Sequence, residues 1–133
     1  MSTISFGKVI NQILNKDSIN QLVSGRVYPL LAPNFDKYPF IVYQKQNLME
    51  QKNKDRRIFD VLEYEIIICS DTYDNSIAIA EVVRSEMEQK NLVVDEFDIY
   101  TVELVACKES VQAPEGAPLL FTQSLTYRFL IRI

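Results

Sequence analysis

Two stretches of the chain, residues 58–70 and 121–133, place apolar residues at every second position, and no other feature constrains the fold as strongly. A period of two is that of a β-strand with one buried face. The inward-facing set is predicted to be Leu62, Tyr64, Ile66 and Ile68 in the first stretch and Phe121, Leu125, Tyr127, Phe129, Ile131 and Ile133 in the second. The chain is therefore expected to contain two long, half-buried strands.

Shorter patterns predict the remaining elements. β-Branched and aromatic residues indicate strands at 40–45 and about 99–107. On the second of these, one side is expected to carry Tyr100, Val102, Leu104 and Ala106. Apolar residues at helical spacing predict helices at 5–16, with Ser5 as N-cap, and at 75–90.

The predicted order is helix, strand, strand, helix, strand, strand in one domain spanning residues 1–133. A further short turn is expected before Gly25, and the polar residues 47–57 are interpreted as a long loop or a splayed hairpin tip. Because the connections are short, antiparallel pairing is favoured. The predicted fold class is α+β, with an antiparallel four-stranded sheet and two helices packed on one of its faces.

Composition excludes several classes of function. A net charge of -4 argues against a nucleic-acid clamp that covers the whole surface. The absence of histidine removes Ser-His, Cys-His and His-metal sites. The three glycines are too far apart for a phosphate-binding loop, and the two cysteines form no C-x-x-C motif. We expect no catalytic residue, no metal and no cofactor.

No leader peptide and no run of eighteen apolar residues is recognised in the sequence. The protein is therefore expected to remain in the cytosol where it is made and to have no membrane partner.

The sheet face away from the helices is predicted to be too apolar for a fully wet surface and rich in complementary charges. It is expected to carry Glu63, Glu65, Ile67, Glu103, Val105, Arg128, Leu130 and Arg132. A face of this composition often meets a copy of itself or a partner chain. The candidate interface residues on it are Glu65, Ile67, Arg128, Leu130 and Arg132.

A second candidate contact lies in residues 50–57, where Lys52, Lys54, Arg56 and Arg57 stand against two acidic residues. This stretch is interpreted either as a loop that reaches another protein or DNA, with protein favoured, or as a solvated hairpin tip. In the proline-rich stretch before it, Tyr28 and Tyr43 are expected to pack under the first helix. The alternative is an aromatic recognition groove that includes Tyr38.

Two sequence blocks carry a resemblance to a known family. Residues 25–30 (GRVYPL), followed after a proline-containing spacer by residues 38–44 (YPFIVYQ), resemble the N-terminal signature of the small tail completion proteins of tailed bacteriophages and prophages. The order of the later elements agrees over nearly the whole chain. The sequence departs from the family in the long, charged 47–57 segment and in the acidic residues Asp95, Glu96 and Asp98.

The resemblance implies a structural virion protein of the tail or neck, assembled in the bacterial cytoplasm as a homo-oligomeric ring, typically a hexamer. Such a ring ends the tail tube and joins it to the head connector. The implied partners are other copies of the chain, the tail tube protein and the head connector, with DNA passing through the ring as a passive contact. Acidic residues would then ease the passage of DNA rather than bind a metal.

Two alternatives stay open at this point. The first is a head-side neck or connector protein with the same fold. The second is a small α+β ligand-binding domain or carboxylate-dependent hydrolase, which would require a deep polar pocket.

Overall fold

The computed structural model describes residues 3–32, 37–53, 56–88, 97–113, 115–116 and 119–132, with the backbone alone described for residues 53, 56 and 57. Its elements are η1 (Thr3–Phe6), α1 (Gly7–Leu14), α2 (Asp17–Val23), β1 (Val27–Pro29), β2 (Phe40–Asn53), β3 (Arg56–Ser70), α3 (Tyr73–Met87), β4 (Asp98–Gln112) and β5 (Leu120–Arg132).

The strands form one five-stranded mixed sheet in the order β1-β2-β3-β5-β4. β1 pairs with β2 in parallel, whereas the other three pairings are antiparallel. The α+β class is confirmed, but the predicted four-stranded antiparallel sheet lacks β1. This strand has three residues and ends at Pro29, so it carries no alternation that a pattern could detect. Its pairing begins where Ile41 N–H donates to the Arg26 carbonyl over 2.9 Å.

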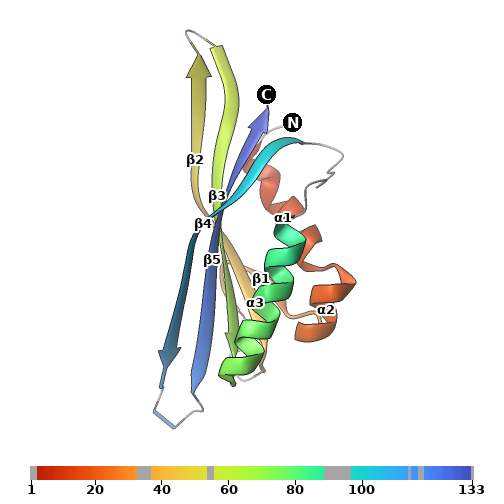
Figure 1. Ribbon diagram of the computed structural model, residues 1–133, viewed down its shortest axis with the longest axis vertical. Helices are drawn as coiled ribbons and strands as arrows, with labels where there is room; N and C mark the ends of the chain where they lie inside the picture. The colour runs from red at the N-terminus through yellow and green to blue at the C-terminus, as the bar shows by residue number, and fades with distance from the viewer. Residues whose placement is uncertain are drawn as a thin grey trace.

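The helices lie together on one side of the sheet, as Figure 1 shows, and they number three in the described part of the chain rather than two. The short turn expected before Gly25 is the helix α2, which ends through left-handed backbone at Ser24 (φ 53°) and Gly25 (φ 75°). The predicted helix 5–16 is a 3₁₀ turn followed by α1, whose N-cap is Phe6 rather than Ser5. The N-cap of α3 is Thr72, whose hydroxyl accepts from Asn75 N–H.

Phe6 is at the centre of the core between the helices and the sheet. It is fully buried, and its ring centroid lies 5.0 Å from that of Phe129 and 5.2 Å from that of Phe97. The predicted inward sets on β3 and β5 are confirmed at Leu62, Tyr64, Ile66, Ile68, Leu125, Tyr127, Phe129 and Ile131. Phe121 is only half-buried, and Ile133 is outside the described residues.

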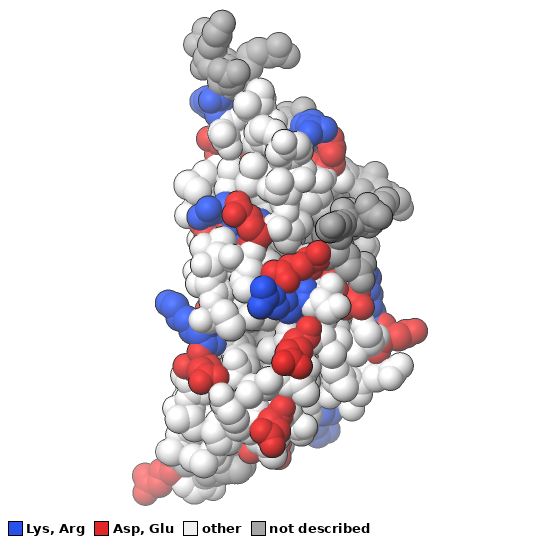
Figure 2. Space-filling view, viewed as in Figure 1, with Lys and Arg blue, Asp and Glu red and all other residues white. Residues whose placement is uncertain are grey.

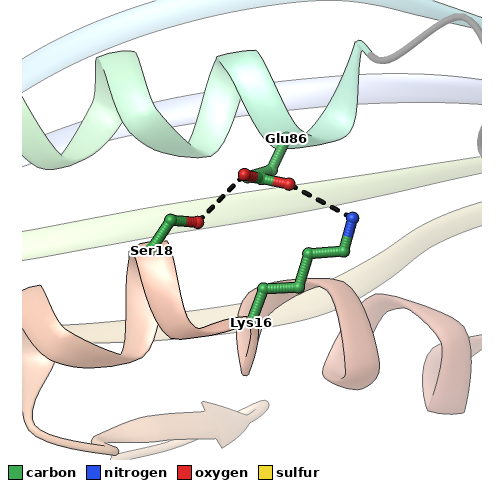
Figure 3. Close-up of polar contacts among 3 residues, drawn as sticks. All are labelled: Lys16, Ser18 and Glu86. Carbon is green, nitrogen blue, oxygen red and sulfur yellow. Dashed lines mark hydrogen bonds and ion pairs between the residues drawn. The ribbon is translucent and has the colours of Figure 1, made fainter.

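A polar contact fastens the first two helices to the third (Figure 3). Glu86 of α3 accepts a hydrogen bond from Ser18 Oγ at 2.9 Å and an ion-paired one from Lys16 Nζ at 3.1 Å. Both contacts favour the charged carboxylate, so they lower the pKa of Glu86. The junction between α1 and α2 is thereby held against the last turns of α3.

Two hairpins extend the sheet at opposite ends of the molecule (Figure 1). Of the two interpretations of residues 47–57, the long loop is wrong and the hairpin is present but paired rather than splayed: β2 continues to Asn53 and β3 begins at Arg56, with pairing down to these two residues. Both faces of this two-stranded ribbon are exposed to solvent, so polar residues are compatible with strand structure there. The change to polar residues at 47 therefore did not mark the end of β2. The β4–β5 hairpin extends toward the opposite end of the molecule from the β2–β3 hairpin.

The predicted alternation of β4 is confirmed at Val102 and Leu104 but is wrong at Tyr100 and Ala106, because the register with β5 shifts between Ile99 and Thr101 and again between Leu104 and Ala106. The extra residue at the first shift turns Tyr100 away from the core, where it is 56% exposed. Val102 and Leu104 pack against the core as predicted, and Ile99 does so in place of Tyr100.

Candidate functional site

The strand register arranges the outer face, defined as the sheet face opposite the helices, in rows that cross the strands. One row holds Met49, Val61, Leu130 and Thr101, and the next holds Asn47, Glu63, Arg128 and Glu103. Arg128 contacts Glu63 over 3.4 Å. The predicted grouping of apolar and complementary charged residues is therefore present within a single subunit.

Glu65 is the centre of a hydrogen-bond network on this face. Its carboxylate accepts from Gln44 Nε2 at 2.8 Å and Gln46 Nε2 at 2.9 Å, and from Ser124 Oγ at 2.6 Å. These donors come from β2 and β5, on either side of β3. Glu65 therefore stabilises the sheet of its own subunit as well as being a candidate for a contact between subunits.

Arg132 lies at the end of β5 among aromatic residues. Its guanidinium is 4.9 Å from the centre of the Tyr100 ring and 3.4 Å from Asp98. The Tyr100 ring is in turn 5.3 Å from that of Phe59. Since Arg132 and Asp98 are both about half exposed, this group is an accessible mixture of charge and aromatic surface.

The chain itself covers one end of the outer face. Phe40, Cys69 and Ala32 form a small second core, and Ile67 packs against it half-buried. Tyr28 also packs there, 6.4 Å from Phe40, so its expected place under the first helix is wrong. Tyr43 is buried in the main core as predicted, and its hydroxyl accepts from Asn11.

The basic stretch at the β2–β3 tip is only partly described. Lys52 is exposed and lies 3.9 Å from Glu50 of its own strand. Arg56 and Arg57 are placed by their backbone in β3, and Lys54 lies outside the described residues. An exposed pair of this kind contributes about 0–1 kcal/mol, so it does not fix the conformation of Lys52.

A surface feature that the sequence reading missed is the exposed dipeptide Leu30–Leu31. The two side chains are 71% and 68% exposed. Leu30 has a positive φ of 67°, and Leu31 N–H donates to the Pro29 carbonyl over 2.7 Å across it, closing a tight three-residue turn. Left-handed backbone at a leucine costs about 1–2 kcal/mol, so the fold holds this apolar pair outward against a local preference.

The backbone is anchored on both sides of this dipeptide. Leu30 N–H donates to the Tyr43 carbonyl over 2.9 Å, and Ala32 is buried in the second core. The Arg26 guanidinium donates to the Tyr38 and Pro39 carbonyls beyond it. The dipeptide is therefore a fixed projection at the β1 edge of the sheet.

A hollow of about 250 Å³ lies at the opposite edge, lined by Tyr73, Glu109, Ser110, Val111 and Phe121. The Tyr73 hydroxyl donates to Glu109 over 3.0 Å, and Gln123 Nε2 donates to the same carboxylate over 3.1 Å. The carboxylates of Glu109 and Asp74 raise the pKa of Tyr73. The walls of the hollow are mainly apolar, and its rim carries the acidic side chain of Glu109.

The two cysteines and the acidic side chains are the remaining candidates for nucleophile or metal chemistry. Burial raises the pKa of the Cys69 thiol to about 11, which keeps it protonated, whereas Cys107 is exposed. No group of three or more acidic or cysteine side chains in the described ranges could hold a metal ion. Asp95 and Glu96 are outside those ranges, and Asp98 contacts Arg132.

Acidic and basic side chains are interspersed on the face shown in Figure 2, with uncharged surface between them. No continuous basic patch covers that face. None of the helices in the described residues is long and apolar enough to cross a membrane.

Comparison with known proteins identifies the fold. No family model and no curated protein matches the sequence. The structure is similar to a chain in the virion of a native gene transfer agent (GTA) particle, with a TM-score of 0.74 and 17% sequence identity. The match covers 93% of this chain and 92% of the other, so the similarity extends over the whole fold rather than one motif.

Proposed function

We propose that this protein is a structural subunit of a phage or phage-like particle. The observation that carries the proposal is the full-length similarity to a chain of the GTA virion, which agrees with the tail-completion signature at residues 25–30 and 38–44. A binding rather than catalytic role is consistent with the outer face, where Arg128 pairs with Glu63 and Glu65 accepts from Ser124 within the sheet.

Within the particle, we place the protein as a homo-oligomeric ring, hexameric in the simplest case, at the head-proximal end of the tail. The ring would end the tail tube and bind the head connector, with DNA passing through as a passive contact. A closed ring needs two different surfaces on each copy. The outer face is one proposed surface, and the two hairpins at opposite ends of the long axis are suited to contact partners above and below the ring (Figure 1).

Leu130 offers a direct test of the outer face. Leu130→Glu places a carboxylate beside Val61, in the apolar row that a neighbouring copy would cover, and covering a charge that the neighbour does not pair is costly. We expect a folded monomer by light scattering coupled to size-exclusion chromatography, whereas Leu22→Glu on the helix side should assemble like the wild type. A Leu130→Glu variant that still forms rings in negative-stain images would refute the outer face as a subunit interface.

Binding assays separate the two positions in the particle. The tail-terminator proposal expects wild-type protein to bind the ends of tail tubes. Binding to the head connector alone would instead favour the head-side neck protein. Loss of the gene should leave tails of uncontrolled length in the first case and tails of normal length without heads in the second.

One observation keeps a ligand-binding alternative in view. A groove of about 570 Å³ between α1 and β1, lined by Ile4, Lys8, Asn11, Pro29 and Tyr43 among others, lies within the ~300–1,000 Å³ of small-molecule sites. Its described lining contains no carboxylate, so it does not support a carboxylate-dependent hydrolase.

A further inference from the structure

We propose that the Leu30–Leu31 projection of one copy inserts into the Tyr73–Val111–Phe121 hollow of the next copy, and that this contact closes the ring. The inference rests on the proposed ring and adds to the outer face a second contact between neighbouring copies, made by the two edges of the sheet. Its starting point is that one chain displays both an exposed apolar projection and an apolar hollow.

The sheet order places these two features where a head-to-tail contact needs them. β1, which leads into Leu30, is one edge strand, and β4, which supplies Val111, is the other. Surfaces on opposite edges of one subunit cannot meet within that subunit, but each can meet its counterpart on a neighbouring copy. Such a heterologous contact generates a ring when the rotation closes.

The register gives the offset between the two features. Pro29 pairs with Tyr43, which through Ile66 and Leu125 is level with Cys107 of β4. The hollow lies two to four residues beyond Cys107 and Leu30 one residue beyond Pro29 in the opposite direction, so the offset along the strands is roughly 10–17 Å at ~3.4 Å per residue. Across a sheet about 19 Å wide, at ~4.8 Å per strand, this inclines the strands by roughly 30–40° to the ring axis.

The charges around the two features are complementary. Lys8 lines the groove beside Pro29, and Lys45 donates to the Ile4 carbonyl on the same side of the molecule. The hollow is bordered by Glu109, and Asp74 is close enough to act on Tyr73. A basic rim around the projection therefore faces an acidic rim around the hollow, which favours this contact over one between two identical edges.

The size of the hollow favours side chains of a protein over a small molecule. At about 250 Å³ it is below the ~300–1,000 Å³ range of small-molecule pockets. The anchored backbone around Leu30 lowers the entropy lost when the projection is buried, because the side chains are already presented in a fixed position.

Disulfide trapping tests the contact directly. In a Cys107→Ser background, Leu31→Cys and Val111→Cys are made in separate proteins and together in one chain. After mild oxidation we expect neither single variant to dimerise, the mixture to give a 1:1 covalent dimer, and the double variant to give a ladder that stops at the ring's copy number on a non-reducing gel. Covalent dimers of the Leu31→Cys variant alone would overturn the proposal by showing a contact between identical edges.

Interference provides the second test. Leu30→Asp/Leu31→Asp and Val111→Asp should each remove assembly at concentrations where the wild type forms rings, whereas Leu22→Asp, which also charges an exposed leucine, should not. Rings of wild-type mass from the Leu30→Asp/Leu31→Asp variant would overturn the projection contact and leave the proposed function standing. A wild type that associates neither alone nor on tail tubes, and is absent from particles, would instead overturn the proposed function.

Discussion

Replacing Leu30 with glycine separates backbone strain from side-chain packing, and Leu31 is a matched control beside it. Leu30 and Ser24 are the non-glycine residues with positive φ among those described, so Leu31 has an ordinary negative φ. The two leucines are 71% and 68% exposed. Removing either side chain therefore loses about the same small amount of burial.

The magnitudes follow from three contributions. Glycine gains unfolded-state entropy that costs about 0.4–1 kcal/mol of stability in either variant. The lost burial, about a third of a leucine side chain, costs roughly 0.6 kcal/mol in either variant. Only Leu30→Gly also removes about 1–2 kcal/mol of left-handed strain. We expect Leu30→Gly to lie within about 0.5 kcal/mol of the wild type and Leu31→Gly to be less stable by about 1.3 kcal/mol.

Urea unfolding followed by circular dichroism measures both variants, at a protein concentration low enough to keep the chain monomeric so that assembly adds no stability. The unfolded-state and burial contributions cancel in the comparison of the two variants. Their difference of about 1–2 kcal/mol then reports the strain alone. Equal stabilities, or a less stable Leu30→Gly, would refute the reasoning that Leu30 is held outward against its backbone preference.

Three other predictions test the core and the titrating groups. Phe129→Ala should lower the free energy of unfolding by about 3–5 kcal/mol, and a loss below about 1 kcal/mol would contradict its central place in the core. Cys107 should react with a thiol reagent in the native protein, whereas Cys69, buried and with a pKa of about 11, should react only on unfolding; two fast-reacting thiols would be inconsistent with this. Because the fold lowers the pKa of Glu86, its contribution is present above the unfolded pKa of about 4.3 and is lost as pH falls through the folded value. The stability difference between wild type and Glu86→Gln, below about 1 kcal/mol at pH 7, should therefore vanish in acid, and a difference independent of pH would exclude the ion pair as its source.

The sequence was most informative where burial is one-sided and continuous. The alternation in β3 and β5 predicted the correct inward faces because one residue of slip would bury Glu63 or Arg128 in the core. The helix α3 was predicted from Ile79, Val83 and Met87 for the same reason.

Prediction was wrong where pairing rather than burial decides the structure. The three residues of β1 are held by hydrogen bonds to β2, and no side-chain pattern encodes such a partner. The extra residue at Tyr100 turns this side chain away from the core face that Val102 and Leu104 share, although the three residues alternate regularly in the sequence. The β1–β2 pairing and the register shift in β4 both depend on backbone hydrogen bonds to a strand distant in sequence.

The residues of the candidate site likewise fall into those that the sequence predicted and those that it missed. The sequence placed Glu65, Arg128 and Leu130 together on one face because they follow from strand parity. It missed the exposed Leu30 because a positive φ is expected of glycine, and an apolar pair beside prolines reads as buried. The exposed fraction of a loop residue depends on what the rest of the chain leaves uncovered.

The position of β3 in the sheet has a consequence during synthesis. β3 pairs with β2 through a local hairpin, but its other partner, β5, ends about 60 residues after β3 does. At roughly 5–20 residues per second, one edge of β3 waits about 3–12 s on the ribosome for its partner. A strand edge that stays unpaired for seconds is prone to pair with other nascent chains. Glu63 and Glu65 discourage such pairing, because the glutamates of two copies of the strand repel each other. The residues that hold the finished sheet together thus also protect the unfinished one.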